Sequence, residues 1–248
     1  MNKQEIKELL HVASEVVVMA GDFISTRNQS GRKIRRDSGR DIKIIADIQS
    51  ENIILKHLKR RSDFSILSEE KGLIKGRDEG FIWVVDPLDG TLNFSRKIPF
   101  CCVSIGLWKK DIPLLGAVYD FNRAELFSGI TGSGAWLNNR LIKVSGTCRK
   151  EKAVLFTGFP TNTDFSSKGI QRFTDDIRSY KKTRLLGSAA LSIVYVASGR
   201  VDAYQEENIM LWDIGGALPI LLGAGGKLEM KRCLMANCFN VHVNNGNF

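Results

Sequence analysis

The feature that most constrains this sequence is an apolar run, residues 81–85, that leads directly into Asp86-Pro87-Leu88-Asp89-Gly90-Thr91. A short apolar run that ends in a Pro/Gly turn is typical of a buried β-strand. The end of this strand carries two carboxylates three residues apart. Because two negative charges at such spacing repel each other, the folded protein must supply or recruit a positive partner for them.

Two further acidic elements stand in comparable positions. Glu69 and Glu70 follow the apolar residues 64–67, so they lie at the end of a second predicted strand. Asp213 precedes a predicted helix, where an Asp caps the helix and lies beside its positive end. If these acids converge, their repulsion is on the order of several kcal/mol at intermediate dielectric, and cations must bind them. The acids expected to converge are Glu69, Asp86, Asp89 and Asp213.

The expected cation is Mg²⁺. Ligands that are all oxygen atoms suit hard ions, whereas zinc would favour His or thiolate ligands. The three histidines, His11, His57 and His242, are remote from the acids in the sequence.

The turn itself contains the other parts that hydrolysis of a phosphate ester needs. Pro87 fixes the backbone so that the Leu88 carbonyl points to the same side as the two Asp side chains. Gly90 lets an anion approach the backbone N–H groups that follow it. Thr91 places a hydroxyl where it can orient a water. Together these features predict phosphate-ester hydrolysis with two metal ions.

The net charge of +9 admits two interpretations, a nucleic-acid surface or attraction of small anions such as phosphate esters. The basic residues cluster at 32–36 and 56–61 and are not interleaved with aromatic residues, as they are in single-strand binders. We therefore interpret most of them as solvated faces, and nucleic acid is not the expected partner.

Cysteine usage and hydropathy indicate a cytoplasmic protein. The five cysteines are odd in number and lack CxxC spacing, which argues against a disulfide framework or a zinc site. The simplest interpretation is free thiols in a reducing cytoplasm. We find no run of eighteen apolar residues and no signal-peptide pattern at the N-terminus, so no membrane association is expected.

The pattern of elements changes near residue 150. Before it, we predict a helix over residues 3–26 that ends near Gly21, a mobile loop over 25–40, and a second helix opened by Asp47 as N-cap. Strands follow at 64–67, 81–85, 102–107, 114–119 and 125–127, with turns at Gly132, Gly134 and Asn138-Asn139. After it, strands at 154–157 and 201–204 alternate with helices at 167–179, 189–197 and 214–222. We therefore expect an α+β lobe over 1–150 and an α/β lobe over 151–248.

At these residues the sequence resembles the inositol monophosphatase family of Mg²⁺-dependent, lithium-sensitive phosphatases. The first signature is WVVDPLDGTLNF at 83–94, and the second is WDIGGA at 212–217 followed by Gly-Gly at 225–226. TGFP at 157–160 and GSAA at 187–190 also match. The resemblance covers most of the chain. It implies a layered αβαβα sandwich of the inositol monophosphatase and sugar phosphatase type, combining α+β and α/β parts, in a homodimer.

The resemblance also implies a role for each acid, with two to three Mg²⁺ ions. Glu69, Asp86 and the Leu88 carbonyl would hold the first ion, Asp86, Asp89 and Asp213 the second, and Glu70 a weaker third through water. Thr91, paired with Asp47 and acting with Glu69, would orient the nucleophilic water. The amides of Gly90 and Thr91 would hold the phosphate. The substrate-binding set would be Asp89, Gly90, Thr91, Gly187, Ser188, Ala189, Glu206 and Asp213.

The nature of the ester is indicated by three positions. Glu206 stands where inositol phosphatases place an acid that accepts hydrogen bonds from substrate hydroxyls. Ala189 stands where they have a small residue near the ring. Bisphosphate nucleotidases often have Lys-Glu after the threonine of the first signature, and this sequence has Leu92-Asn93. These positions favour a small polyol or sugar monophosphate.

Two departures from the family pattern stand out. Gly215 and Gly216 occupy a helix start where alanine is frequent, and each Gly costs about 1 kcal/mol in helix propensity. The sequence ends at Phe248, where family members usually add a closing helix, so we expect the last strand to be less covered.

The sequence therefore predicts a Mg²⁺-dependent phosphomonoesterase. One alternative is a 3′(2′),5′-bisphosphate nucleotidase, because a substrate with two phosphates would be attracted by the net charge of +9. An alternative of another class is a basic nucleic-acid or regulatory binding protein on a phosphatase scaffold, against which the complete set of acids argues.

Overall fold

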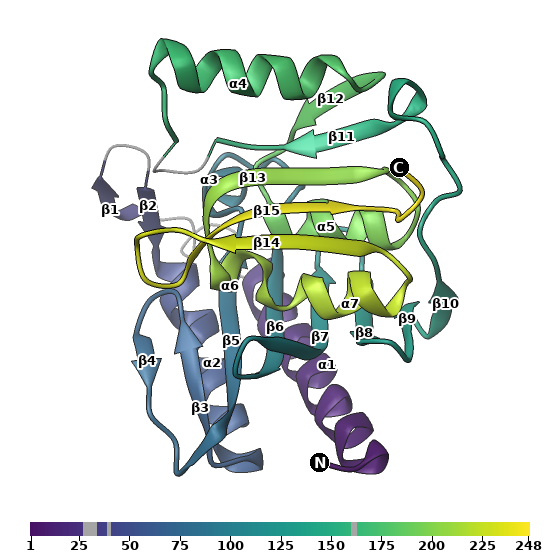
Figure 1. Cartoon of the computed structure of the whole chain (residues 1–248). Helices are drawn as coiled ribbons and strands as arrows, with labels where there is room; N and C mark the ends of the chain where they lie inside the picture. Colours follow the sequence, from purple (N-terminus) through teal and green to yellow (C-terminus); the bar gives the residue numbers. More distant parts are fainter. Residues whose placement is uncertain (27–33, 39–40, 160–162) are drawn as a thin grey trace.

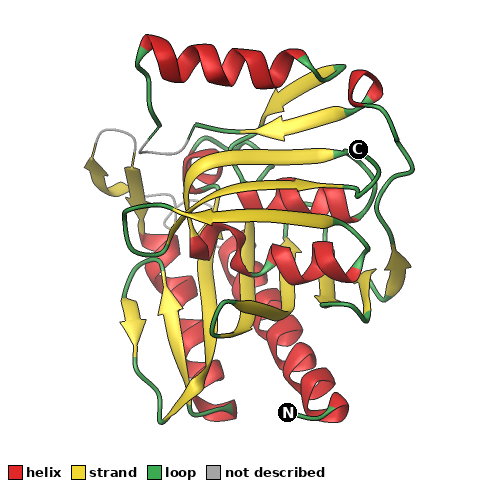
Figure 2. Cartoon of the chain, in the orientation of Figure 1, coloured by secondary structure: helices red, strands yellow, loops and turns green. Residues whose placement is uncertain are grey.

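The chain folds into five layers in the order helices, sheet, helices, sheet, helix (Figure 1). The computed structural model describes residues 1–26, 34–38, 41–159 and 163–248. Figure 2 shows the two sheets crossing at a large angle, with helices between them and on their outer faces. This arrangement confirms the expected layered αβαβα sandwich.

The first sheet has eight strands in the order β10-β9-β8-β7-β6-β5-β3-β4. All neighbours are antiparallel except β3 and β5, which are parallel, so the carboxyl ends of these two strands meet at one edge. The strands are β3 (Phe64–Ser68), β4 (Gly72–Ile74), β5 (Asp78–Asp89), β6 (Cys102–Lys109), β7 (Ile112–Asp120), β8 (Glu125–Ile130), β9 (Gly134–Leu137) and β10 (Arg140–Ile142). The predicted strands of this half are confirmed. So is the turn at Asn138 and Asn139, which both have positive φ.

Helix α1 (Lys3–Thr26) and helix α2 (Ile45–Arg61) cover the outer face of this sheet. By length and composition α1 would be long enough to cross a membrane. It instead packs one face, which includes Ala13, Val17 and Ala20, into the apolar core formed with the sheet and α2. This is the position of a core helix, and α1 extends beyond Gly21, where its end was predicted.

Helix α2 begins one turn earlier than the sequence indicated. Its N-cap is Ile44, and Asp47 is the third residue of the helix, so the prediction of Asp47 as N-cap is wrong. The Asp47 carboxylate still satisfies a backbone donor there, because it accepts a hydrogen bond from the Ile44 N–H at 2.7 Å.

Part of the segment 25–40, which was predicted to be a mobile loop, forms a β-strand in the structure. Residues 27–33 and 39–40 lie outside the described residues. Between them, β1 (Ile34–Ser38) pairs with β2 (Asp41–Ile44) in an antiparallel ribbon, so the prediction of a loop is wrong for residues 34–38.

The second sheet has five strands in the order β12-β11-β13-β15-β14, parallel at β12-β11-β13 and antiparallel beyond. They are β11 (Val154–Thr157), β12 (Lys182–Leu185), β13 (Ala203–Met210), β14 (Lys227–Arg232) and β15 (Cys238–Asn244), preceded by a 3₁₀ turn at Lys150–Lys152. The edge strands β12 and β14 were not predicted, because their charged residues mask the apolar alternation. The division into lobes at residue 150 stays a prediction.

Three helices fill the space between the sheets: α5 (Ala189–Ala197), α6 (Leu211–Gly215) and α7 (Ala217–Gly223). The single helix predicted over 214–222 is wrong, because the helix is interrupted at Gly216. The interruption lies directly against the first sheet. A Cβ at Gly106 would lie 2.1 Å from the Gly215 carbonyl oxygen, and one at Gly116 would lie 1.9 Å from that of Gly216. The glycines that disfavour a helix here allow backbone to pack on backbone.

Helix α4 (Ser167–Arg178) forms the fifth layer, beyond the second sheet (Figure 1). Its Ile177 packs on a small apolar cluster that includes Leu155 and Tyr180. The Phe248 ring meets the Tyr180 ring edge-on at 6.2 Å, so the end of the chain also contributes to this outer layer.

Candidate active site

The end of β5 contains a β-bulge that gathers the first two acids. Asp86 pairs with Ser104 and Asp89 with Cys102, so three residues of β5 advance against two of β6. In a regular strand, residues three apart point to opposite faces. The extra residue reverses this alternation and brings both carboxylates to one side of the sheet. The two aspartates of the DPLDGT motif therefore face the same site.

Hydrogen bonds hold the bulge in place. The Ser50 hydroxyl donates to the Pro87 carbonyl at 2.7 Å, and the Leu88 N–H donates to Asp86 Oδ1 at 3.0 Å. The Thr91 hydroxyl donates to the Leu88 carbonyl at 2.9 Å. This bond uses one of the two lone pairs of the Leu88 carbonyl oxygen, which leaves the other for a ligand.

Thr91 lies beside the buried Asp47. The Thr91 Oγ1 is 3.3 Å from Asp47 Oδ1, within hydrogen-bonding distance, while Asp47 Oδ2 accepts from Ile44. The predicted pairing of these two side chains is thus present in the structure. Helix α2 and the turn after β5, which are 44 residues apart in sequence, meet at this contact.

Asp89 is anchored by the beginning of α5. Its Oδ2 accepts from the Ser188 hydroxyl at 2.5 Å and from the Ala190 N–H at 2.8 Å, and its Oδ1 accepts from the Ala189 N–H at 3.3 Å. Ser188 is also the N-cap of α5, since its side chain accepts from the Leu191 N–H. The predicted GSAA segment is therefore next to the acids, with its donors directed at Asp89.

Asp213 enters the same site from α6. It is the third residue of that helix, and its Oδ2 accepts from the Met210 N–H at 3.1 Å. Asp213 was predicted from the sequence to stand before the first residue of the helix, and this is wrong, because the helix begins about one turn earlier. Its carboxylate nevertheless fulfils the expected role of binding a free backbone donor at the helix start.

Glu69 and Glu70 follow β3 at the edge where β3 and β5 run parallel. The Glu69 N–H donates to the Val85 carbonyl at 3.3 Å, which places Glu69 next to the end of β5. Both glutamates are half-buried. A further acid, Glu51, fixes this turn: its Oε1 accepts from the Ser68 hydroxyl at 2.6 Å and from the Lys71 N–H at 3.0 Å.

Burial and mutual repulsion raise the pKa of the central carboxyls. The pKa of Asp86 is raised well above its usual value by burial first and then by the charges of Glu69, Asp89 and Asp213. Burial raises the pKa of Asp89 to about 6, against the lowering effect of its hydrogen bonds with Ser188 and the α5 amides. The pKa of Asp213 is raised well above its usual value by burial, Glu69 and Asp89. A cation bound here would favour the ionised forms and so lower all three pKa values.

The donor set fits a hard divalent cation. Its members are carboxylate and carbonyl oxygens, which Mg²⁺ prefers. Among the described residues, no group of three or more His, Cys, Asp or Glu side chains stands close enough together to hold a metal ion as it is placed. The hydrogen bonds of Asp89 turn its carboxylate toward the start of α5.

Two glycines with positive φ shape the opening beside the acids. Gly90 has φ 87° and Gly187 has φ 77°, a region that favours glycine. A Cβ at Gly90 would lie 2.9 Å from the Phe100 carbonyl oxygen. The Asn93 side chain donates to the carbonyls of Phe100 and Leu186, at 2.8 and 2.6 Å, and so joins the segment after DPLDGT to the segment before α5.

Glu206 lies near the acids on β13. Its Oε2 accepts from the Tyr204 hydroxyl at 2.6 Å, and burial together with the charge of Asp89 raises its pKa to about 7. A Cβ at Gly158 would lie 2.7 Å from the Glu206 carboxylate, so the glycine lets the Glu206 side chain lie close to the backbone after β11.

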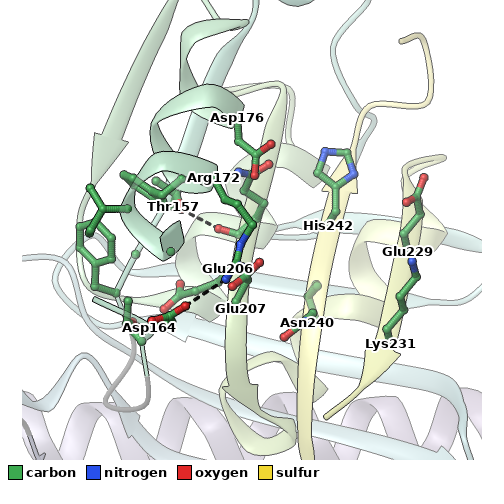
Figure 3. A pocket seen from close by; sticks show the side chains of 18 residues that line it. Thr157, Asp164, Arg172, Asp176, Glu206, Glu207, Glu229, Lys231, Asn240 and His242 are labelled. Carbon is green, nitrogen blue, oxygen red and sulfur yellow. Dashed lines mark hydrogen bonds and ion pairs between the residues drawn. The ribbon is translucent and has the colours of Figure 1, made fainter. Parts of the chain in front are cut away.

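Figure 3 shows a cavity of about 270 Å³ that opens between α4 and the second sheet. Of the predicted site residues only Glu206 lines it. Arg172 on α4 forms an ion pair with Asp164 at its rim. This cavity is thus adjacent to the acids but separate from them.

Several residues that support the site were not identified from the sequence. Glu51 looks like one more charge on an amphipathic helix, and Cys102, Asn93 and Tyr204 lie in apolar or polar runs without a distinctive pattern. The Cys102 thiol donates to Asp89 Oδ2 at 3.7 Å. The spacing of residues along the sequence does not predict such contacts, because the partners lie on separate elements that come together only in the folded chain.

Comparison with known proteins gives one consistent result. The model of the inositol monophosphatase family matches residues 5–238. An inositol-1-monophosphatase of Synechocystis sp. is 39% identical over 233 residues, covering 92% of this chain and 81% of the relative. A Nus factor SuhB of Pasteurella multocida is 34% identical over 222 residues, covering 88% and 83%. The solved inositol monophosphatase of Anabaena (Nostoc) sp. superposes with a TM-score of 0.85 at 33% identity, covering 98% of this chain and 92% of that one.

Proposed function

The chain belongs to the inositol monophosphatase family and is a phosphoric monoester hydrolase, and we propose that it hydrolyses a small polyol or sugar monophosphate with Mg²⁺. The observation that carries the proposal is the convergence of Asp86, Asp89 and Asp213, whose pKa values are raised, with Glu69 at the end of β3 acting on two of them through its charge. Such a group is stabilised in its ionised form by bound cations.

Each acid has its own part in holding the ions. Glu69, Asp86 and the Leu88 carbonyl would hold one Mg²⁺, and Asp86, Asp89 and Asp213 a second. Glu70 would contact a third ion through water. When bound, the ions supply Lewis-acid polarisation of the phosphate and stabilise the leaving alkoxide. The raised pKa of Asp89, about 6, still leaves this carboxyl ionised at neutral pH.

Thr91 and Asp47 are the residues that would orient the attacking water. The Thr91 hydroxyl donates a hydrogen bond to Asp47 or to the Leu88 carbonyl, so its oxygen can accept a hydrogen bond from the attacking water. Glu69, just after β3, would accept the proton that this water loses as its oxygen attacks the phosphorus. The buried Asp47 thus acts through Thr91, and general-base assistance of this kind contributes about 10²–10⁴ in rate.

The phosphate would bind at the turn that follows the acids. Gly90 is the left-handed residue before α3 (Thr91–Ser95), and the N–H groups of Gly90 and Thr91 begin this helix. Backbone donors of this kind bind anions well. Gly187, Ser188 and Ala189 would line the opposite side of the substrate, where the small Ala189 side chain leaves room for a ring.

Glu206 would select substrates that carry hydroxyl groups. Its carboxylate now accepts from the Tyr204 hydroxyl and has further lone pairs for a substrate hydroxyl. A bisphosphate nucleotide would bring a second negative charge near Glu206 and Asp213, which favours the polyol or sugar phosphate over the nucleotidase alternative.

A substrate panel tests the proposal. Phosphate release is measured with inositol, fructose, glycerol, histidinol and adenosine phosphates, each with and without Mg²⁺. We expect release from a polyol or sugar phosphate that depends on Mg²⁺. A strong preference for 3′-phosphoadenosine 5′-phosphate would favour the nucleotidase. If no ester is hydrolysed while affinity for an oligonucleotide falls steeply with salt, the binding-protein alternative is correct.

We also propose a cytoplasmic homodimer. The apolar side chains of Leu92, Ile98 and Leu185 are about half exposed, at 51%, 48% and 50%, on the two segments that Asn93 joins. Large exposed apolar groups on adjoining segments favour contact with a second copy. Light scattering after gel filtration is expected to give twice the mass of the chain, and a monomer at micromolar concentration would contradict this part of the proposal.

A further inference from the structure

Two cysteines stand opposite each other at the turn end of the β14–β15 hairpin. Arg232 pairs with Phe239, so the next pair along the ladder is Cys233 and Cys238. The Cys233 N–H donates to the Cys238 carbonyl at 2.9 Å. Hydrogen-bonded antiparallel pairs have Cα atoms about 5.5 Å apart, and disulfides most often join Cα atoms about 5.5–6 Å apart. The two residues are therefore within the reach of a disulfide after a local adjustment of the turn.

The two side chains also lie on the same side of the hairpin, because directly opposite residues of an antiparallel pair project from the same face. The Cys233 thiol donates to Oδ1 of Asn240, two residues after Cys238 on β15, at 3.2 Å. Both cysteines are free thiols in the structure.

The two thiols differ in access to solvent. Cys233 is half-exposed beside the fully exposed Leu234, whereas Cys238 is 2% exposed. Burial raises the pKa of the Cys238 thiol to about 11. Cys233 is therefore the thiol that meets an oxidant in solution, and Cys238 is placed to react second.

No other arrangement of cysteines in the described residues has these properties. Cys101 and Cys102 are adjacent and buried, so their side chains point to opposite faces of the strand, and Cys148 is exposed without a cysteine partner.

We propose that Cys233 and Cys238 form a reversible disulfide in response to a disulfide oxidant such as oxidised glutathione. The Cys233 sulfur attacks the oxidant, loses its proton to solvent and releases one glutathione. The Cys238 sulfur then attacks the Cys233 sulfur of the mixed disulfide, loses its proton and releases the second glutathione. The two protein thiols are oxidised by two electrons in total, and the oxidant is reduced to two thiols.

The hairpin is connected to the acid site by a strand pairing and by a hydrogen bond to the start of α6. Cys238 pairs with Met210, whose N–H donates to Asp213. The Asn237 carbonyl accepts from the N–H of Leu211, the first residue of α6, at 2.8 Å. A disulfide constrains the turn between Cys233 and Cys238, and with it the Asn237 carbonyl that binds the start of α6. On the proposed function of Asp213, the oxidised protein binds Mg²⁺ more weakly.

Peptide mapping tests the disulfide independently of any catalytic activity. The full-length protein is equilibrated in buffers of reduced and oxidised glutathione, quenched with acid, alkylated and digested with trypsin. Because no Lys or Arg follows Arg232, one peptide, residues 233–248, carries both cysteines and no others. We expect this peptide to lose the mass of two hydrogen atoms and to resist alkylation, while the peptide with Cys148 gains at most one glutathione.

Matched variants separate the outcomes. Cys238→Ser is expected to leave Cys233 as a stable mixed disulfide with glutathione, and Cys148→Ser is expected to leave the 233–248 disulfide unchanged. If the 233–248 peptide of the unmodified chain stays reduced, or retains glutathione, over the whole range of buffers, the proposed disulfide does not exist.

The effect on the acid site is measured separately. We expect oxidation to raise the Mg²⁺ concentration for half-maximal phosphate release by about threefold, the scale of one weakened hydrogen bond, and dithiothreitol to reverse the change. The response should be absent in Cys233→Ser. If the disulfide forms while this concentration is unchanged, the regulatory role is wrong and only the modification site remains.

Discussion

At the scale of single residues, the site is defined by carboxylates whose neighbours are also negative. Asp86, Asp89 and Asp213 are held by backbone N–H groups of Leu88, Ala190 and Met210, each of which fixes one oxygen. These bonds position the acids without neutralising them. The negative charge that the three carboxylates keep is the chemical basis for cation binding.

The first prediction concerns stability and pH in the absence of divalent cations. Burial raises the pKa of Asp89 to about 6 and that of Glu206 to about 7, so the folded state holds protons that the unfolded state has released. The free energy of unfolding should therefore fall as pH rises from about 4 to about 7, by about 1.4 kcal/mol per unit of pKa shift. Urea unfolding in chelator over this range measures it.

Added Mg²⁺ provides the control for this prediction. It binds the ionised carboxylates, so it should stabilise the protein more at pH 8 than at pH 5. A metal-free protein that becomes more stable between pH 4 and pH 7 would contradict the assignment of buried, repelling carboxyls.

The second prediction concerns Thr91. Thr91→Val removes the hydroxyl that connects Asp47 with the Leu88 carbonyl but retains the shape of the side chain. We expect kcat for phosphate release to fall by about 10²–10⁴, with KM nearly unchanged. Thr91→Ser keeps the hydroxyl and should retain most of the activity. Equal losses in both variants would show that the methyl group, not the hydroxyl, is what matters.

The third prediction concerns Glu206. Glu206→Gln keeps the size of the side chain and an acceptor for Tyr204, but removes the charge. We expect KM for a polyol phosphate to rise about tenfold, which corresponds to about 1.4 kcal/mol, while KM for p-nitrophenyl phosphate, which has no hydroxyls, changes little. Equal changes for both substrates would argue against a role in substrate selection.

At the scale of secondary-structure elements, the bulge in β5 and the break between α6 and α7 decide where the acids lie. The break depends on glycine. A Cβ at Gly116 would overlap the Gly216 carbonyl oxygen, so Gly116→Ala must push α6 and α7 away from the sheet. We expect the free energy of unfolding to fall by about 1–3 kcal/mol or more, measured by urea unfolding.

Gly146→Ala is the matched control for this variant, because no atom lies within 4 Å of its added Cβ and its φ is not positive. Its stability should be unchanged within about 0.5 kcal/mol. If both variants have the same stability, the close packing of α6–α7 on the sheet is not required for folding.

The same elements explain which structural features the sequence could predict. Runs such as 81–85 and 102–107 are largely apolar because their strands are covered on both faces, so the apolar pattern identified them. Strands β12 and β14 lie at sheet edges and carry Lys and Arg, and they were missed. The helix break at Gly216 was missed because it depends on the approach of β6 and β7, which no local pattern encodes.

The candidate site was predictable for a related reason. Asp86 and Asp89 share one motif, and Glu69 and Asp213 stand next to recognisable strand and helix ends. Their supporting partners come from other elements: Ser188 from α5, Met210 from β13 and Glu51 from α2. Such contacts are set by tertiary packing, so only the resemblance to a known family, and not spacing, placed Ser188 near the acids.

At the scale of the whole molecule, the two sheets bring together acids from both halves of the chain. Glu69, Asp86 and Asp89 belong to the first sheet, while Asp213 follows the second sheet and lies on the helix layer between them (Figure 1). Cation binding should therefore stabilise the contact between the two sheets as well as enable hydrolysis.

The most direct test of this account is phosphate release from inositol monophosphate by metal-free protein titrated with Mg²⁺, compared with the Asp89→Asn variant. Asn retains a side-chain oxygen to accept from α5 but removes the charge that binds the ion. We predict no release in chelator, a saturable rise with Mg²⁺ for the unmodified chain, and a loss of at least about 10²-fold for Asp89→Asn. Unchanged release by Asp89→Asn, or full release in chelator, would contradict the central claim.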